Sequence, residues 1–222
     1  MSLLGRRARG LTLALPLVIA AGILIPGVCR AQKPGKGDFL VAGRDLRDPN
    51  FSRTVVLLIG YDPEGAMGLV INRRTHVPVS EVFTESEELR RAVGRIYLGG
   101  PVSLNQFFIL VQTKHPSAGS LHLLGNLYLS DQEFLQGMLG GGGQEEFRVY
   151  AGYAGWGASQ LDREIDRGDW HVLPGDEKSV FSEEPATVWE VLIERSNAVW
   201  AMRTPREAAR DETAPGTAST GQ

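Results

Sequence analysis

A run of apolar and β-branched residues at positions 53–61 constrains the fold of this 222-residue chain more than any other feature. Such a run predicts a strand buried inside a sheet. Asp62–Gly65 places proline and glycine where a tight turn favours them, and residues 67–72 form a second strand-like run. The sequence therefore predicts a β-hairpin, which favours antiparallel pairing over a β-α-β unit.

The remaining segments predict more strands than helices. Further strands are expected at residues 38–43, 96–98, 107–113, 147–153 and 170–173, with one or two short strands within 121–129. Helices are expected at residues 78–93 (broken once), after a capping box at 130–133, at 159–167 with Ser159 as its cap, and at 184–199. The fold class predicted is an α/β (α+β) sandwich, a mixed and largely antiparallel sheet with helices packed against it.

Residues 1–31 differ from the rest of the chain. Three arginines precede an uncharged apolar stretch at residues 11–28, and Cys29–Ala31 resembles a signal-peptidase site. This pattern predicts a signal peptide and an exported, periplasmic protein. An uncleaved membrane anchor is the main alternative, and the membrane would then be contacted only through residues 1–31. A misassigned start would instead make the protein cytoplasmic.

The rest of the sequence divides into three parts. Residues 32–36 form a short linker, residues 37–202 form one domain, and the composition of residues 203–222 predicts a disordered tail. Residues 1–31 hold four of the 23 basic residues, which leaves 19 against 26 acidic residues and a formal charge of −7. Nucleic-acid binding usually needs a basic face, so this charge argues against a nucleic-acid partner.

Motifs for metal binding and catalysis are missing from the sequence. Cys29 is the only cysteine, and the four histidines show no short ligand spacing, so no metal and no cofactor are predicted. The segment Gly157–Leu161 has Leu161 where a nucleophile elbow around Ser159 needs glycine. The sequence therefore favours binding over catalysis, and leaves an enzyme without a familiar motif as an alternative.

The glycine-rich segment 152–157 lies between a predicted strand and a predicted helix. It predicts either a tight turn or a ligand-binding loop, although acidic residues early in the helix would repel an anion. Arg53 begins one buried-looking strand, and Asn72 ends another. Each needs polar partners, which for Arg53 could be Asp48, Asn50 or Glu164. A pocket that combines Asn72 with Tyr153 and Trp156 is the alternative.

Five strings, in this order and spacing, resemble the AlgH/YqgE family of bacterial proteins. They are Asp48–Val56, Gly65–Asn72, Gly99–Val102, Gly152–Trp156 and Gln160–Ile165. The resemblance covers roughly residues 37–195 and implies a single α/β domain. Members are often labelled transcriptional regulators, and the family offers no catalytic residues to carry over.

The resemblance also implies a candidate binding surface built from the motif positions. It consists of Arg53, Asn72, Gly99, Gly100, Pro101, Gly152, Tyr153, Gly155, Trp156 and Gln160. The function predicted is a non-catalytic domain that binds a small molecule or a protein partner at this surface. Transcriptional regulation is the alternative, supported only by the family label.

Overall fold

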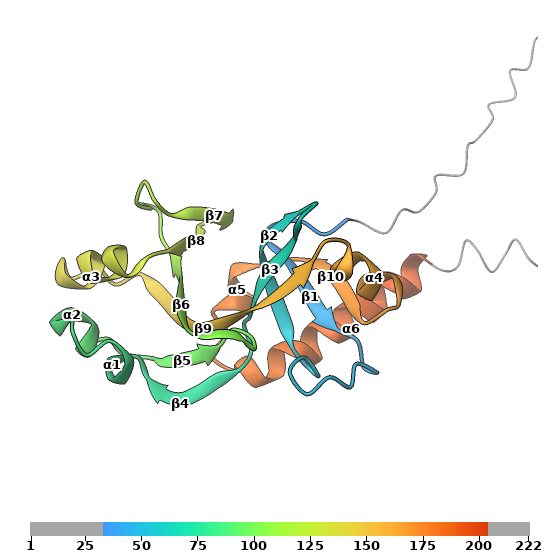
Figure 1. Ribbon diagram of the computed structural model, residues 1–222, viewed down its shortest axis with the longest axis horizontal. Coiled ribbons are helices and arrows are strands. Elements are labelled where there is room, and N and C mark those ends of the chain that lie inside the picture. Colours follow the sequence, from blue (N-terminus) through green and yellow to red (C-terminus); the bar gives the residue numbers. More distant parts are fainter. Residues whose placement is uncertain (1–32, 204–222) are drawn as a thin grey trace, which may run out of the picture. The chain divides into compact units, whose positions relative to one another are not determined.

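The computed structural model describes residues 33–203 (Figure 1). The predicted signal segment 1–31 and residues 204–222 of the predicted tail lie outside this range. The strands are β1 (Asp38–Ala42), β2 (Val55–Asp62), β3 (Gly65–Val70), β4 (Arg74–Pro78), β5 (Arg95–Leu98), β6 (Val102–Gln112), β7 (Leu121–Leu124), β8 (Leu127–Ser130), β9 (Glu146–Gly157) and β10 (Trp170–Pro174). The helices are α1 (Val79–Val82), α2 (Glu87–Arg90), α3 (Gln132–Gly140), α4 (Gln160–Asp166), α5 (Glu177–Val180) and α6 (Pro185–Arg203).

The strands form one mixed sheet in the order β10-β1-β2-β3-β9-β6-β8-β7, with β5 paired to β9 and β4 to β5. Every pairing is antiparallel except that of β5 with β9. The predicted fold class is therefore confirmed, as is the β2–β3 hairpin. At its turn, an Asp62 carboxylate oxygen accepts hydrogen bonds from the backbone N–H groups of Glu64 and Gly65, at 2.9 and 3.0 Å.

Two hydrophobic cores lie on opposite faces of β6 and β9. Phe108 and Leu110 of β6 belong to the larger core, whereas Ile109 and Val111 belong to the smaller one. The smaller core packs against α1, α2 and α3, which lie together beside β5 and β6 in Figure 1. Because alternate residues of a strand point to opposite faces, the unbroken apolar run in β6 follows from burial on both sides.

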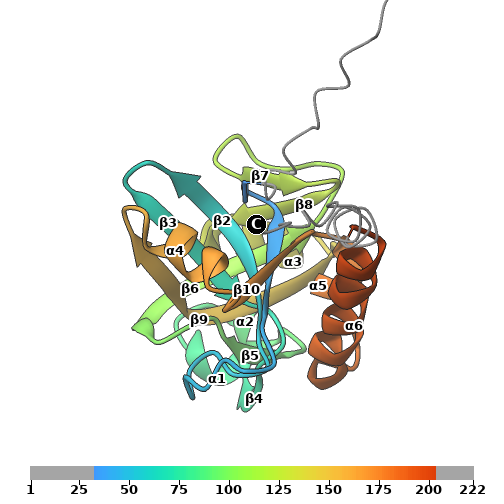
Figure 2. The same ribbon diagram turned by 90° about the vertical axis from the view of Figure 1, so that its right-hand side faces the viewer.

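Helix α6 covers the larger core beside β1 and β10 (Figure 2). Its buried side chains recur at helical spacing, as the sequence predicts: Val188, Trp189, Leu192 and Ile193. The Trp189 indole N–H also donates a hydrogen bond to the Ala42 carbonyl oxygen at 2.8 Å, which fixes the helix to β1. Among residues 33–203, none of the helices combines the length and the apolar character that crossing a bilayer requires.

Several local predictions are wrong. Residues 152–157 form neither a turn nor a loop, because β9 continues through them and pairs with β3. Asp131, not Ser130, caps α3, since its side chain accepts the Phe134 N–H, and Ser159 makes no capping hydrogen bond. Strand β4 and helix α5 are additional elements: no residue of β4 is buried, so it lacks an apolar pattern, and α5 has only four residues.

Candidate functional site

A pocket of about 190 Å³ opens where β4, β5 and β9 meet the start of α1. We call it the arginine pocket, because three of its nine lining residues are arginines. The lining consists of Arg74, Val79, Val93, Gly94, Arg95, Tyr97, Phe147, Arg148 and Val149.

Strand register gathers these arginines. Arg74 on β4 lies opposite Tyr97 on β5, and Tyr97 lies beside Tyr150 on β9. Arg95 is two residues before Tyr97, and Arg148 is two residues before Tyr150, so all three arginines belong to one face of the sheet. Like charges on neighbouring strand positions are unfavourable, so the gathering gains nothing for the sheet itself.

Arg148 is the most enclosed of the three arginines. Its guanidinium carbon lies 4.6 Å from the ring centre of Tyr97 and 5.7 Å from that of Phe181. One terminal nitrogen, Nη2, donates a hydrogen bond to the Ser182 carbonyl oxygen. The other, Nη1, is buried without a hydrogen-bond partner in the described part of the chain. This nitrogen is closed to solvent, and Arg148 interacts with the buried Tyr150 hydroxyl outside normal hydrogen-bond geometry.

No carboxylate within residues 33–203 forms an ion pair with these arginines, although the charge of Glu146, in addition to burial, acts on Tyr97 of the pocket and raises its pKa. The ion pairs found in this range involve other arginines. Arg95 donates a hydrogen bond only to a backbone oxygen, that of His76. A concave surface of one charge sign with apolar walls concentrates the electrostatic potential. This arrangement is chemically suited to hold negative charge.

Two tyrosines extend the polar character beneath the pocket. Burial raises the pKa of Tyr97 and of Tyr150, an effect that the positive charge of Arg148 opposes. Both phenols therefore stay protonated at neutral pH. The Tyr150 hydroxyl is buried, and it has no hydrogen-bond partner of normal geometry within residues 33–203. Arg148 and the fully buried Tyr150 therefore act on each other inside the protein.

The pocket offers few groups for catalysis. Its lining contains no serine, cysteine, histidine, lysine or carboxylate, and Tyr97 carries its only hydroxyl group. In the described residues, no group of three or more histidine, cysteine, aspartate or glutamate side chains is placed to hold a metal ion. The geometry offers binding and charge stabilisation.

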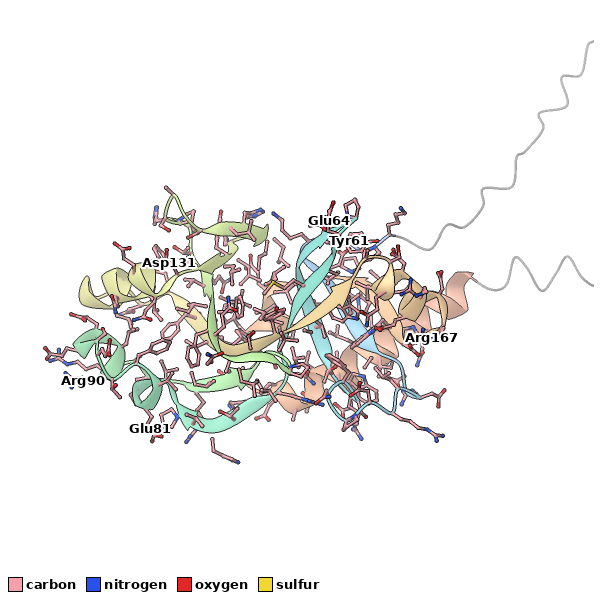
Figure 3. All side chains as sticks on the ribbon, viewed as in Figure 1. Tyr61, Glu64, Glu81, Arg90, Asp131 and Arg167 are labelled. Atoms are coloured by element: carbon pink, nitrogen blue, oxygen red, sulfur yellow. The ribbon has the colours of Figure 1, made fainter. Side chains whose placement is uncertain are left out.

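A second cleft, of about 380 Å³, lies between the β2–β3 hairpin and α4. Tyr61 and Glu64 mark this hairpin in Figure 3. The Tyr61 hydroxyl donates a 2.6 Å hydrogen bond to Asp162, and this bond, more than burial, raises the pKa of Tyr61 to about 12. Asp62 is occupied by the turn. The second cleft is larger, but its two carboxylates already hold hydrogen bonds within the protein and it gathers no group of arginines, so the arginine pocket is the better candidate.

None of the ten residues of the predicted binding surface lines either cleft. Five of them meet where β9 crosses the segment before β6: Gly99, Gly100, Pro101, Gly152 and Tyr153. A Cβ atom on Gly99 would lie 2.3 Å from the Gly152 carbonyl oxygen, and one on Gly100 would lie 2.1 Å from the Tyr153 backbone. These glycines are required for close backbone approach.

Trp156 and Gln160 are held by a shared partner, Glu164. The Trp156 indole N–H donates to one Glu164 oxygen at 2.8 Å, and the Gln160 amide donates to the other at 2.9 Å. Gly155 belongs to the same stretch of β9 and pairs with Met67 of β3. Only 6% of Trp156 is exposed, and the pocket of Asn72, Tyr153 and Trp156 stays a prediction.

Arg53 and Asn72 lie elsewhere. The prediction that Arg53 is buried is wrong: its side chain is 64% exposed, pairs with Glu190 and lies 4.9 Å from the ring centre of Trp189. Asn72 braces the backbone, since its amide accepts from the Val55 N–H at 2.9 Å and donates to the Arg53 carbonyl oxygen at 3.0 Å. Whether the exposed members of this surface bind a partner stays a prediction.

Comparison with known proteins identifies the family. The model of the AlgH-like family matches residues 39–200. The chain belongs to the AlgH-like family. It is 34% identical to a UPF0301 protein of Methylococcus capsulatus over 176 residues, which is 77% of this chain and 96% of that protein. It is 35% identical to a UPF0301 protein of Streptomyces coelicolor over 172 residues, or 75% and 89% of the two chains.

Solved structures show the same AlgH-like fold. The solution structure of the AlgH protein from Pseudomonas aeruginosa matches with a TM-score of 0.52 and 32% identity, covering 82% of this chain and 95% of that one. The crystal structure of a Corynebacterium diphtheriae protein matches with a TM-score of 0.60 and 25% identity, covering 73% and 87%. These names give a family and no reaction, so the function of this AlgH-like chain must be argued from its own geometry.

Sequence reasoning missed the arginine pocket altogether. Arg74, Arg95 and Arg148 are separated by long stretches of sequence, and the chain is acidic overall, so composition argues against a local basic site. The only available signal was that these arginines flank or interrupt strand-like runs. The pairing of β4, β5 and β9 is needed to bring them together.

Proposed function

We propose that this AlgH-like chain is a non-catalytic binding domain that holds a small ligand in the arginine pocket. One observation carries the proposal: three arginines, none of which forms an ion pair within residues 33–203, line one concave site. Guanidinium groups without a carboxylate partner remain free to bind a ligand. The apolar walls and few polar groups fit the usual make-up of a ligand site.

The proposal is tested by ligand capture with the pocket mouth closed. Val93 lines the pocket and is 91% exposed, so Val93→Trp should block the entrance without disturbing the core. Val191 on α6 is 62% exposed and does not line the pocket, so Val191→Trp is the matched control. Native mass spectrometry after incubation with a small-molecule extract of the source cells would report the ligand.

The expected result is a bound mass on the wild-type protein and on Val191→Trp, lost from Val93→Trp. Binding that survives in Val93→Trp would place the site elsewhere. The absence of any bound small molecule on the wild-type protein would contradict the proposal.

We also propose that residues 1–31 direct export, so that the domain acts in the periplasm or on the membrane surface. The basic start, the apolar stretch and the Cys29–Ala31 site support this. Cell fractionation with intact-mass measurement tests it. A mass that begins at Gln32 in the periplasm, or a full-length chain in the membrane, supports export; a soluble full-length chain in the cytoplasm contradicts it.

A further inference from the structure

The pocket also indicates what kind of ligand it takes. Resting on the binding function proposed above, we infer that the arginine pocket binds a small organic oxyanion: a carboxylate or phosphate monoester that carries one compact apolar group. The arginines would hold the charged head, and the apolar lining residues would hold the body.

The guanidinium groups of the pocket determine which charged group of a ligand it can bind. Arginine presents planar pairs of N–H donors that match the oxygen spacing of carboxylate and phosphate. Arg74, Arg95 and Arg148 come from three paired strands and line the same pocket, so their positive charges act on the same site. Arg148 is pre-positioned, since Tyr97, Phe181 and the Ser182 carbonyl already restrain its guanidinium. A pre-positioned donor loses little side-chain entropy on binding.

The apolar body is specified by the rest of the lining. Val93 is 91% exposed and Phe147 is partly exposed, so these two residues offer apolar surface to a ligand, whereas Val79 and Val149 are closed off at 1% and 0% exposure. A dry cavity of roughly 150 Å³ accepts one benzene molecule. The arginine pocket, at about 190 Å³, therefore has room for a ring or a short branched chain beside the charged head. Inorganic phosphate would leave the apolar walls without contacts.

A long polyanion fits less well. Residues 32–222 carry a formal charge of −7, and the exposed Glu146 lies two residues before Arg148, on the same face of β9. A nucleic acid leaving the pocket would meet more of this acidic surface than a small anion held beside the arginines. The charge balance therefore favours a small ligand over a nucleic acid.

Four probes separate these possibilities in calorimetric titrations of the full chain. Benzoate and phenyl phosphate carry both head and body, benzamide keeps the body without the charge, and inorganic phosphate keeps the head without the body. We expect benzoate or phenyl phosphate to bind at least about tenfold more tightly than benzamide and inorganic phosphate, and binding to weaken as salt is raised. Arg74→Gln and Arg95→Gln should each weaken binding by about tenfold or more.

Arg163→Gln is the matched control, because Arg163 is exposed on α4, does not line the pocket, and its loss changes the net charge equally. If benzamide and benzoate bind equally well, the inference that the ligand carries a charged head is wrong. The same follows if Arg163→Gln weakens binding as much as Arg74→Gln and Arg95→Gln do. If inorganic phosphate binds as tightly as phenyl phosphate, the inference that the ligand carries an apolar group is wrong. Salt-sensitive binding of a DNA duplex with no binding of the small anions would overturn the inference in favour of a nucleic-acid surface.

These outcomes are distinct from failure of the binding function itself. A neutral molecule captured by the wild-type protein and lost from Val93→Trp would keep the binding domain and overturn the oxyanion. If neither the cell extract nor any of the probes binds, both proposals fail.

Discussion

Glu164 shows how one side chain can account for several residues of the family motif. One of its oxygens accepts hydrogen bonds from the indole N–H groups of both Trp156 and Trp170, at 2.8 and 2.9 Å. The two indoles pack edge to face, with ring centres 5.9 Å apart, and Phe51 contacts both. The sequence predicts that Trp156 and Gln160 belong to a binding surface. Their hydrogen bonds to Glu164 give both residues a role in stabilising the fold.

Removing this carboxylate should destabilise the fold. In Glu164→Ala, two buried indole donors lose their acceptor, so the free energy of unfolding should fall by about 2–4 kcal/mol. Glu164→Gln keeps an acceptor oxygen in place and should cost clearly less. Urea denaturation followed by tryptophan fluorescence measures both. Equal, small losses in the two variants would show that the indole hydrogen bonds contribute little.

At the scale of elements, β9 organises the sheet. Residues 146–151 of β9 pair with β5 and β6, whereas residues 154–157 pair with β3. Between these two stretches, Gly152 has a φ of 69°, a left-handed conformation that glycine adopts without strain. The glycines that suggested a turn instead let the strand continue past a kink, as the long β9 arrow in Figure 1 shows.

Gly152→Ala should disrupt this kink. The added Cβ would lie 2.7 Å from the carbonyl oxygens of Gly100 and Val102, at a φ that alanine disfavours. We expect a loss of more than about 1 kcal/mol of unfolding free energy. Gly137→Ala, in the middle of α3 with open space around it, should instead stabilise by roughly 0.5–1 kcal/mol. Thermal melts of the pair test this, and a Gly152→Ala variant as stable as wild type would refute the role of the kink.

At the scale of the whole molecule, the two cores are joined by the strands they share. Tyr150 of β9 lies in the larger core and Val149 in the smaller, so neither face can lose its packing without exposing a strand of the other. The tryptophans at positions 156, 170 and 189 all belong to the larger core. Their fluorescence therefore reports on a core that is separated by the sheet from α1, α2 and α3.

This shared sheet predicts cooperative unfolding. Leu135 on α3 is fully buried in the smaller core, and Leu135→Ala should lower the unfolding free energy by about 2–5 kcal/mol. The unfolding transition followed by tryptophan fluorescence should shift together with the transition followed by far-ultraviolet circular dichroism. This is expected although Leu135 lies in the smaller core and the tryptophans at positions 156, 170 and 189 lie in the larger one. A tryptophan transition that stays at its wild-type midpoint would mean that the two cores unfold independently.

Sequence alone determined the features that depend on neighbouring residues. Local sequence pattern predicts the β2–β3 hairpin, the buried run in β6 and the apolar face of α6. It does so because apolar residues recur with different periods in strands and in helices. The family also followed from short strings in register. Capping was less certain, since Ser130 and Asp131 are adjacent candidates and only the geometry of the α3 N-terminus selects Asp131.

Tertiary structure alone decided where the chemistry lies. Arg74, Arg95 and Arg148 become neighbours only through the parallel pairing of β5 with β9 and the addition of β4, a strand that the sequence did not predict. Arg53, which the sequence placed in the interior, lies outside against Trp189. The reason is physical: strand pairing joins residues distant in sequence, and local pattern carries no information about which strands will meet.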